Sequence, residues 1–188
     1  PLKYGGIERI VAMLCDGLSD KGHEVTLFAS PGSTAKGRLI SGFEKPLLDA
    51  NIAWSNPIWN LRNLSLAIEM ANGGKFDIIH SHLDLWALFF HNLTQTPVIH
   101  TMHNPLYRTN ADANKDDRLR LFMEEANRTN IVFISESAKE QAMLKFPEER
   151  AKVIYNGSDL SHFKFNVQGG DHFIWIARMN KHKGVENA

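Results

Sequence analysis

Residues 76–102 read FDIIHSHLDLWALFFHNLTQTPVIHTM, which is the pattern of a strand at 76–80, a helix at 85–93 and a second strand at 97–102. Both strands contain apolar runs rather than strict alternation, and such runs are typical of strands that are buried on both faces of a sheet. Strands joined through a helix lie parallel in one sheet. The stretch therefore predicts part of a parallel sheet that is covered by helices.

The same alternation of strands and helices extends in both directions along the chain. Glycines follow two of the expected helices, at Gly22 and at the pair Gly73 and Gly74, where a helix commonly ends. The pattern predicts the α/β class with a doubly wound, Rossmann-like parallel sheet. The remaining expected elements are helices at 7–21, 60–72, 117–128 and 137–146, and strands at 24–29, 39–43, 130–135 and 152–156.

The end of the chain reads as the opening of a second α/β domain. Phe173 to Ala177 is an apolar run between a Gly-Gly-Asp turn and a basic turn, which predicts a buried strand and then a helix near Gly184. We therefore expect a first domain over residues 1–165 and an incomplete second domain over residues 166–188. The opening PLKYGG reads as a loop that leads into a helix, so the first strand is expected to precede it.

Composition excludes several classes of protein. The 188 residues are 43% hydrophobic, which suffices for one sizeable core, and 21 Lys and Arg balance 21 Asp and Glu. A chain without net charge has no long-range attraction for nucleic acid or for an anionic membrane. Cys15 lies on the apolar stripe of the first helix, so a core residue is expected rather than a disulfide or a zinc ligand. No membrane span or signal peptide is visible, which favours a cytoplasmic protein.

Polar and cationic residues gather where the expected strands end. Ligands of doubly wound sheets bind at the carboxyl ends of the strands, so these positions are the candidates for chemistry. They are Gly5 and Gly6 before the first helix, Ser30 and Pro31, His80, Ser81 and His82, His103 and Asn104, Ser135 and Glu136, Asn156 and Gly157, and Arg178 with Lys183.

The histidines fall into two groups. Two-residue periodicity directs His80 and His82 to the same face of the sheet. No carboxylate or thiol is spaced to complete a tetrahedral set, so no metal site is expected and neutral imidazoles that form hydrogen bonds are favoured. We expect His80 and His100, within strands, to be core histidines with satisfied hydrogen bonds. His82 and His103 lie further out and are expected to contact a ligand.

The glycine pair and the cation pair each have two interpretations. Gly5 and Gly6 let the backbone approach a phosphate or a sugar oxygen, and a tight turn explains them equally well. Arg178 and Lys183 bracket a loop before an expected helix, where a bound diphosphate would offset their mutual repulsion. A solvated basic loop is the alternative.

Several blocks together resemble one family. GGIERIVAMLCDGLSDKGHEVTLFAS, FDIIHSHLDLW, PVIHTMHN, FISESAKE, VIYNGSDLSHF and IARMNKHKG are similar, in order and spacing, to blocks of retaining GT-B glycosyltransferases of the GT4-like group. The resemblance implies two Rossmann-like domains, an acceptor side and a donor side, with this chain as the first domain and the opening of the second. It implies a hexosyltransferase of carbohydrate biosynthesis that uses a nucleotide-diphosphate sugar and neither a cofactor nor a metal.

The resemblance also implies roles for single residues. His103 would lie near the transferred sugar, and Arg178 and Lys183 would grip the donor diphosphate. Ala177 stands where the family usually has glycine, and the glutamates that recognise the donor would lie beyond Ala188, so these 188 residues alone are expected to transfer no sugar. Acceptor or substrate contacts are implied for Gly5, Gly6, His82, Asn104, Ser135, Glu136 and Asn156.

Partners and competing functions follow from the same residues. The implied partners are a nucleotide-sugar donor, the rest of the protein's second domain, and a sugar, lipid-linked or small-molecule acceptor. No nucleic acid is expected as a partner. Any association with the inner face of the membrane is expected to be peripheral. The alternatives are a non-catalytic sugar-binding domain of the same fold and a nucleotide-sugar epimerase; a dehydrogenase is disfavoured because no GxGxxG follows a strand. The acceptor loops are expected at 31–37, 54–59 and 105–117. Trp54 and Trp59 would stack on a sugar ring or pack against helices. Tyr107 and Arg108 would meet an acceptor phosphate or carboxylate or belong to a solvated loop.

Overall fold

The computed structural model describes residues 5–47, 49–53, 56–104, 122, 124–126, 128–142, 149–177, 179 and 181–187. The chain divides into two compact units, Pro1–Gly157 and Ser158–Ala188. This division falls earlier than the domain boundary expected at residue 165, and the extent of the two domains stays a prediction.

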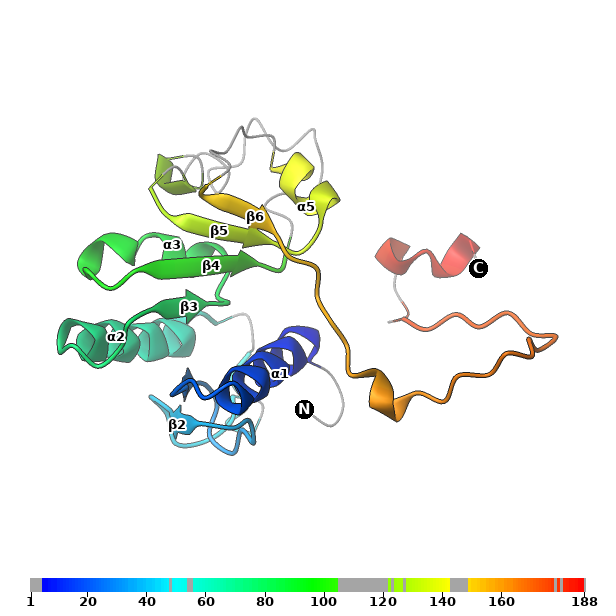
Figure 1. Ribbon diagram of the computed structural model, residues 1–188, viewed down its shortest axis with the longest axis horizontal. Coiled ribbons are helices and arrows are strands. Elements are labelled where there is room, and N and C mark those ends of the chain that lie inside the picture. Colours follow the sequence, from blue (N-terminus) through cyan, green and yellow to red (C-terminus); the bar gives the residue numbers. More distant parts are fainter. Residues whose placement is uncertain are drawn as a thin grey trace. The chain divides into compact units, whose positions relative to one another are not determined.

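The first unit has the expected alternation of helices and strands (Figure 1). The helix expected over residues 85–93 is split into two short helices, and the helix expected over 117–128 lies mostly outside the described residues. The strand expected at 76–80 begins and ends later than predicted. The elements are α1 (Gly6–Asp20), β1 (Thr26–Phe28), β2 (Arg38–Ile40), α2 (Ile58–Asn72), β3 (Ile79–Ser81), α3 (Leu85–Leu88), the 3-10 helix η1 (His91–Leu93), β4 (Val98–Met102), β5 (Asn130–Phe133), α5 (Glu136–Gln141) and β6 (Ala151–Val153).

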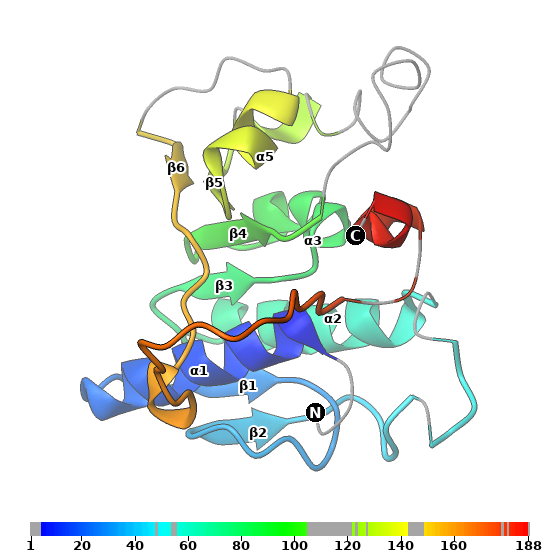
Figure 2. The same ribbon diagram turned by 90° about the vertical axis from the view of Figure 1, so that its right-hand side faces the viewer.

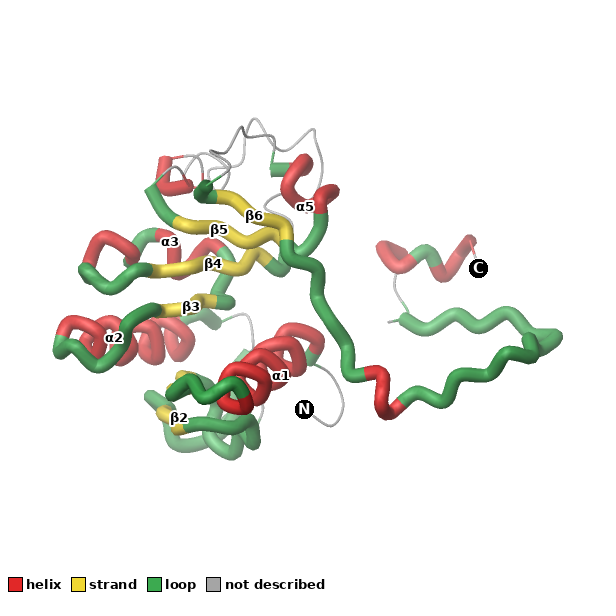
Figure 3. The backbone as a smooth tube through the Cα atoms, in the orientation of Figure 1, coloured by secondary structure: helices red, strands yellow, loops and turns green. Residues whose placement is uncertain are grey.

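All paired strands of the first unit are parallel, as the apolar runs predict, and Figure 3 shows β3, β4, β5 and β6 side by side. One sheet has the order β3-β4-β5-β6, with Ser81 opposite His100 and Met102 opposite Phe133. β1 and β2 form a separate two-stranded pair. Because β3, β4 and β5 run in the same direction, the residues that follow them lie at one edge of the sheet.

Helices cover both faces of these strands. Figures 1 and 2 place α1 and α5 on one face and α2 and α3 on the opposite face. Four of the five residues of β4, the second strand of the larger sheet, are buried, which agrees with a strand covered on both sides. The predicted class, a doubly wound α/β fold, is confirmed.

Two helices end in the same hydrogen-bonded motif, and a glycine makes each ending possible. After α1, Gly22 has φ 87 and its N–H bonds to the Ser19 carbonyl, while the His23 N–H bonds to the Leu18 carbonyl. α2 ends in the same way at Gly74, which has φ 71. Only glycine adopts this backbone conformation without strain, so the chain turns sharply from each helix towards the next strand.

Two apolar clusters hold the first unit together. The larger one joins β4, β5 and β6 to the helices beside them and includes the fully buried Phe122, Phe133 and Leu88. The smaller one packs Leu64 and Ile68 of α2 against the α3 region. Cys15 is buried in α1, as predicted, and burial raises the pKa of its thiol.

The second unit has short 3-10 helices and extended loops. The strand expected at residues 173–177 is not formed there, and the expected helix near Gly184 is replaced by the 3-10 helices η4 (Lys181–Lys183) and η5 (Val185–Asn187). A strand needs a paired neighbour, and Ile174 and Ile176 are 81% and 90% exposed instead of packed. Among the residues that the structure describes, no helix combines the length and the apolar character needed to cross a membrane.

Candidate functional site

The ends of β3 and β4 bring three histidine rings together. The rings of His80 and His82 lie 4.3 Å apart between centroids, so both point to one face, as their spacing predicts. The His82 ring stacks on that of His103, with centroids 5.1 Å apart, and His82 Nδ1 lies 2.8 Å from His103 Nε2. The two histidines predicted as ligand contacts are therefore hydrogen-bonded neighbours.

Both members of this pair are neutral near pH 7. Burial, followed by the neighbouring His80 and His103, lowers the pKa of His82 to about 3. Burial also lowers the pKa of His103, although the Asp84 carboxylate acts in the opposite direction. A hydrogen bond between two neutral imidazoles needs one N–H and one lone pair, so the tautomer of either ring fixes the tautomer of the other.

Asp84 joins the loop after β3 to the loop after β4. Its Oδ1 accepts a hydrogen bond from the backbone N–H of His103 at 2.7 Å and a longer one, 3.4 Å, from the backbone N–H of Asn104. Its Oδ2 accepts from Asn104 Nδ2 at 2.6 Å. Sequence reasoning missed this residue, because an aspartate directly before a helix is normally read as the cap of that helix.

A cavity of about 200 Å³ lies beside His103 and Asn104. Hydroxyl groups at the start of α5 and the amide of Gln141 at its end line it, together with apolar side chains of β4 and β5. Such a mixture of apolar walls and a few hydrogen-bonding groups suits a small polyhydroxylated ligand. The lining residues are Met102, His103, Asn104, Phe133, Ile134, Ser135, Ser137, Ala138 and Gln141.

Ser135 has a local structural role as well as a place in this lining. It is the N-cap of α5, and its Oγ accepts a hydrogen bond from the Ala138 N–H at 3.0 Å. Glu136 is the first residue of the same helix, where a carboxylate is favoured by the helix dipole. The structure thus brings Ser135 to the cavity that His103 and Asn104 line.

The glycine pair forms the start of α1, and α1 begins at the edge where the strands end (Figures 1 and 2). Gly5 is the N-cap residue, with φ 146, a value that favours glycine. Gly6 is the first residue of α1, and an added Cβ would meet nothing within 4 Å. Backbone conformation therefore explains glycine at position 5, whereas packing does not require glycine at position 6.

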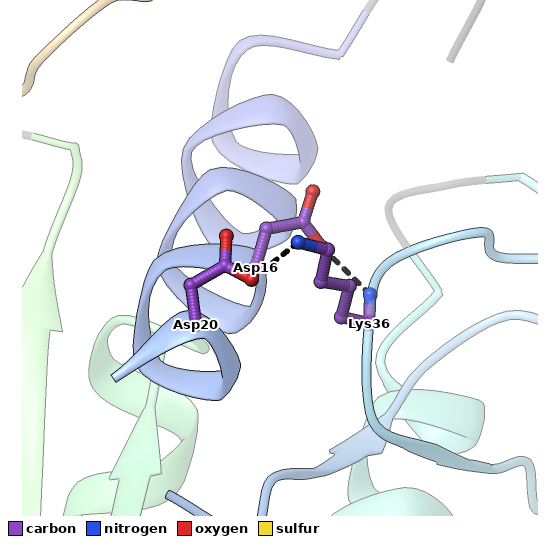
Figure 4. Close-up of polar contacts among 3 residues, drawn as sticks. All are labelled: Asp16, Asp20 and Lys36. Carbon is purple, nitrogen blue, oxygen red and sulfur yellow. Dashed lines mark hydrogen bonds and ion pairs between the residues drawn. The ribbon is translucent and has the colours of Figure 1, made fainter. Parts of the chain in front are cut away.

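The predicted acceptor loop at residues 31–37 is anchored to α1 (Figure 4). The backbone N–H of Lys36 donates to Asp16 Oδ1 at 2.6 Å, and the Lys36 ammonium pairs with the Asp20 carboxylate. Next to Lys36, Gly37 has φ 99, and a Cβ there would lie 2.5 Å from the Val25 carbonyl oxygen. These contacts fix the end of the loop on the helix.

Each of the other predicted site residues is exposed elsewhere in the first unit, packs there against an aromatic ring, belongs to the second unit or lies outside the described residues. Asn156 is exposed in the loop after β6. Lys183 belongs to the second unit, where its carbonyl accepts a hydrogen bond from Trp175 Nε1 at 3.3 Å. Trp59 packs against Phe43, with ring centroids 5.7 Å apart, so it is a packing residue. Arg178, Trp54 and the loop 105–117, with Tyr107 and Arg108, lie outside the described residues.

The prediction for His80 and His100 is partly wrong. His100 is buried, at 1% exposure, but neither ring nitrogen has a hydrogen-bond partner among the described residues. His100 lies in the middle of the covered strand β4, and burial, followed by the neighbouring His91 and His80, lowers its pKa to about 4. His80 is more exposed than expected, and its Nε2 hydrogen-bonds to Thr101 Oγ1 at 2.8 Å.

The imidazoles at the strand ends face one another instead of converging on one point. In the described part of the chain, no group of three or more His, Cys, Asp or Glu residues is placed to hold a metal ion. The chemistry available here is hydrogen bonding by neutral rings, an amide and hydroxyls.

Solved structures share this fold. The chain is similar to the crystal structure of Anabaena Alr3699/HepE in complex with UDP-glucose, with 18% sequence identity over 84% of the chain and a TM-score of 0.53. It is similar to the same Anabaena protein in complex with UDP and glucose, with 17% identity over 83% of the chain and a TM-score of 0.52. The chain spans 42% of the length of the Anabaena protein in both structures.

Sequence comparison assigns the family. No curated protein sequence matches the chain. The sequence model of Glycosyltransferase Family 4 matches residues 4–162, which include α1, every strand and the histidine pair at the ends of β3 and β4. The chain therefore belongs to Glycosyltransferase Family 4.

Proposed function

We propose that the protein transfers a sugar from a nucleotide-diphosphate sugar to an acceptor hydroxyl, with retention of the anomeric configuration. The observation that carries the proposal is the family match over residues 4–162. The similar fold of an Anabaena protein that was solved with UDP-glucose supports a nucleotide sugar as the donor. Transfer is assigned to the intact protein, because the chain spans 42% of that neighbour.

The geometry at the strand ends suits a sugar ring. The Nε2 of His103 is bound to His82, which leaves its Nδ1 for a sugar hydroxyl, and the side-chain amide of Asn104 still has a donor hydrogen and an acceptor oxygen. Both residues line the cavity of about 200 Å³ beside the start of α5. In the proposed complex, His103 hydrogen-bonds to a hydroxyl of the transferred sugar, and Asn104 and Ser135 bind the acceptor.

Retention follows from a front-face route. The acceptor oxygen forms its bond to the anomeric carbon on the face from which the diphosphate leaves, while the bond from that carbon to the phosphate oxygen breaks. The acceptor proton passes to the leaving phosphate, so no side chain of this unit has to act as the base. Arg178 and Lys183 would stabilise the negative charge that develops on the diphosphate.

The test is a donor screen followed by product analysis. Nucleotide sugars are screened with the intact protein by thermal shift, because a bound donor raises the melting temperature by mass action. The donor that shifts the melting temperature is then incubated with hydroxyl acceptors, and the anomeric configuration of the product is read by proton NMR. A product with the donor's configuration supports the proposal. An inverted product, or no transfer from any donor, rejects it.

A further inference from the structure

Asp84 has an unusual backbone for an aspartate at the start of a helix. It has φ 47 and ψ −130, and it is one of two non-glycine residues with positive φ in the described part of the chain. It occupies the N-cap position of α3, yet its side chain makes no cap hydrogen bond there. A residue kept in such a conformation is held by its surroundings. For Asp84, the surrounding contacts that hold it are its hydrogen bonds to the residues after β4.

The hydrogen bonds of Asp84 fix two residues that line the cavity, His103 and Asn104. Asp84 Oδ1 holds the backbone N–H of His103 at 2.7 Å, and His82 Nδ1 lies 2.8 Å from the far side of the His103 ring, at Nε2. His103 is therefore held at both its backbone and its ring. A carboxylate only accepts hydrogen bonds, so the 2.6 Å bond to Asn104 Nδ2 also fixes which end of that amide faces Asp84.

We propose that Asp84 is a positioning residue for sugar transfer, which holds the imidazole of His103 and the amide of Asn104 in place at the cavity. What these two groups do to the substrate rests on the function proposed above, whereas their placement by Asp84 does not. The carboxylate acts through His103 and Asn104 and need not touch the sugar.

The charge of Asp84 provides a second, independent readout of this contact. Among the described residues, the titratable groups that face His103 are His80 and His82, from β3 and the loop after it, and Asp84 itself. Burial lowers the pKa of His103, and the Asp84 carboxylate opposes that change. Removal of the charge should therefore lower the pKa of His103 further.

Three variants separate the possible effects. Asp84→Gly removes every side-chain contact, and glycine tolerates the positive φ. Asp84→Asn removes the charge but keeps one acceptor oxygen and a residue that also tolerates positive φ. Asp77→Asn is the matched control, because Asp77 is an exposed carboxylate at the other end of β3. Urea unfolding of each variant checks that it is folded before any other measurement.

The experiment combines NMR of histidine with transfer kinetics on the intact protein. In Asp84→Gly, the amide and ring signals of His103 should move, and kcat should fall about 100-fold, the effect of misplacing a reacting group by roughly 1 Å, with little change in the KM for the donor. In Asp84→Asn, the pKa of His103 should fall and kcat should fall less. Asp77→Asn should leave the His103 signals and kcat unchanged.

Two results would overturn the assignment. The first is an Asp84→Gly protein whose His103 signals match the wild type, whatever its activity. The second is a protein in which those signals move while kcat stays at the wild-type value. If the wild type transfers no sugar from any donor, the proposed function fails, and the NMR comparison still decides whether Asp84 positions His103.

Discussion

Replacement of His100 by leucine should stabilise the protein. The ring is 1% exposed, and its two nitrogens, one N–H and one lone pair in the neutral form, have no partner among the described residues. A buried polar group that lacks its hydrogen bond costs about 1–3 kcal/mol, and leucine has no such group. We therefore expect His100→Leu to raise the free energy of unfolding near pH 7 by about 1–3 kcal/mol.

Acid should enlarge the difference between the two proteins. The folded protein keeps His100 neutral down to about pH 4, whereas the unfolded chain takes up a proton near pH 6.5. Wild-type stability is therefore full above about pH 6.5 and falls as the pH drops towards the folded pKa. At pH 5, which is 1.5 units below the unfolded value, His100 alone accounts for a loss of about 2 kcal/mol. The advantage of His100→Leu should grow by that amount.

Urea unfolding at pH 7 and at pH 5, followed by circular dichroism, measures both quantities. His23→Gln, at an exposed site after α1, is the control for the loss of an imidazole and should change stability by less than about 0.5 kcal/mol. A His100→Leu protein less stable than the wild type at pH 7 would show that the ring is satisfied. An unchanged difference between the two pH values would refute the acid argument.

Three further substitutions test the packing of the first unit by urea midpoint. Gly37→Ala should lower the free energy of unfolding by about 2–4 kcal/mol, because the new methyl group would lie 2.5 Å from the Val25 carbonyl oxygen at a φ of 99. A loss no larger than that of a substitution in an exposed loop would contradict this. Gly17→Ala, inside α1 with nothing within 4 Å, should instead stabilise by about 0.5–1 kcal/mol, and a loss would mean an unseen clash. Glu125→Ala should lower the free energy of unfolding by about 1–3 kcal/mol, because Nε2 of His91, whose side chain is 8% exposed, loses its partner at 2.9 Å. A variant as stable as the wild type would mean that this contact contributes nothing to stability.

Periodicity predicts those elements whose own residues determine them. The stripe from Ile7 to Leu18 predicts α1, and Gly22 predicts its end, because a left-handed residue is needed there. The strand-end rule for parallel sheets predicts that His82 and His103 lie at the same edge of the sheet, and their 2.8 Å contact agrees with that placement. Both inferences need only local pattern and topology.

Features that depend on contacts distant in sequence could not be predicted in this way. The sequence pattern assigned no role to Asp84, and only the position of β4 beside β3 makes His103 and Asn104 its partners. The hydrogen-bond state of His100 depends on the side chains that pack around β4. The apolar run at 173–177 matches a strand locally, yet a strand forms only where another strand pairs with it.

The rate of sugar transfer by a His103→Ala variant tests the proposed site most directly. With the donor and acceptor found by the screen, we expect kcat to fall at least about 100-fold, because the group that orients the transferred sugar is lost. His23→Ala, which removes an exposed imidazole after α1, should transfer at the wild-type rate. A His103→Ala protein that transfers sugar as fast as the wild type would contradict the proposal that the strand ends form the transfer site.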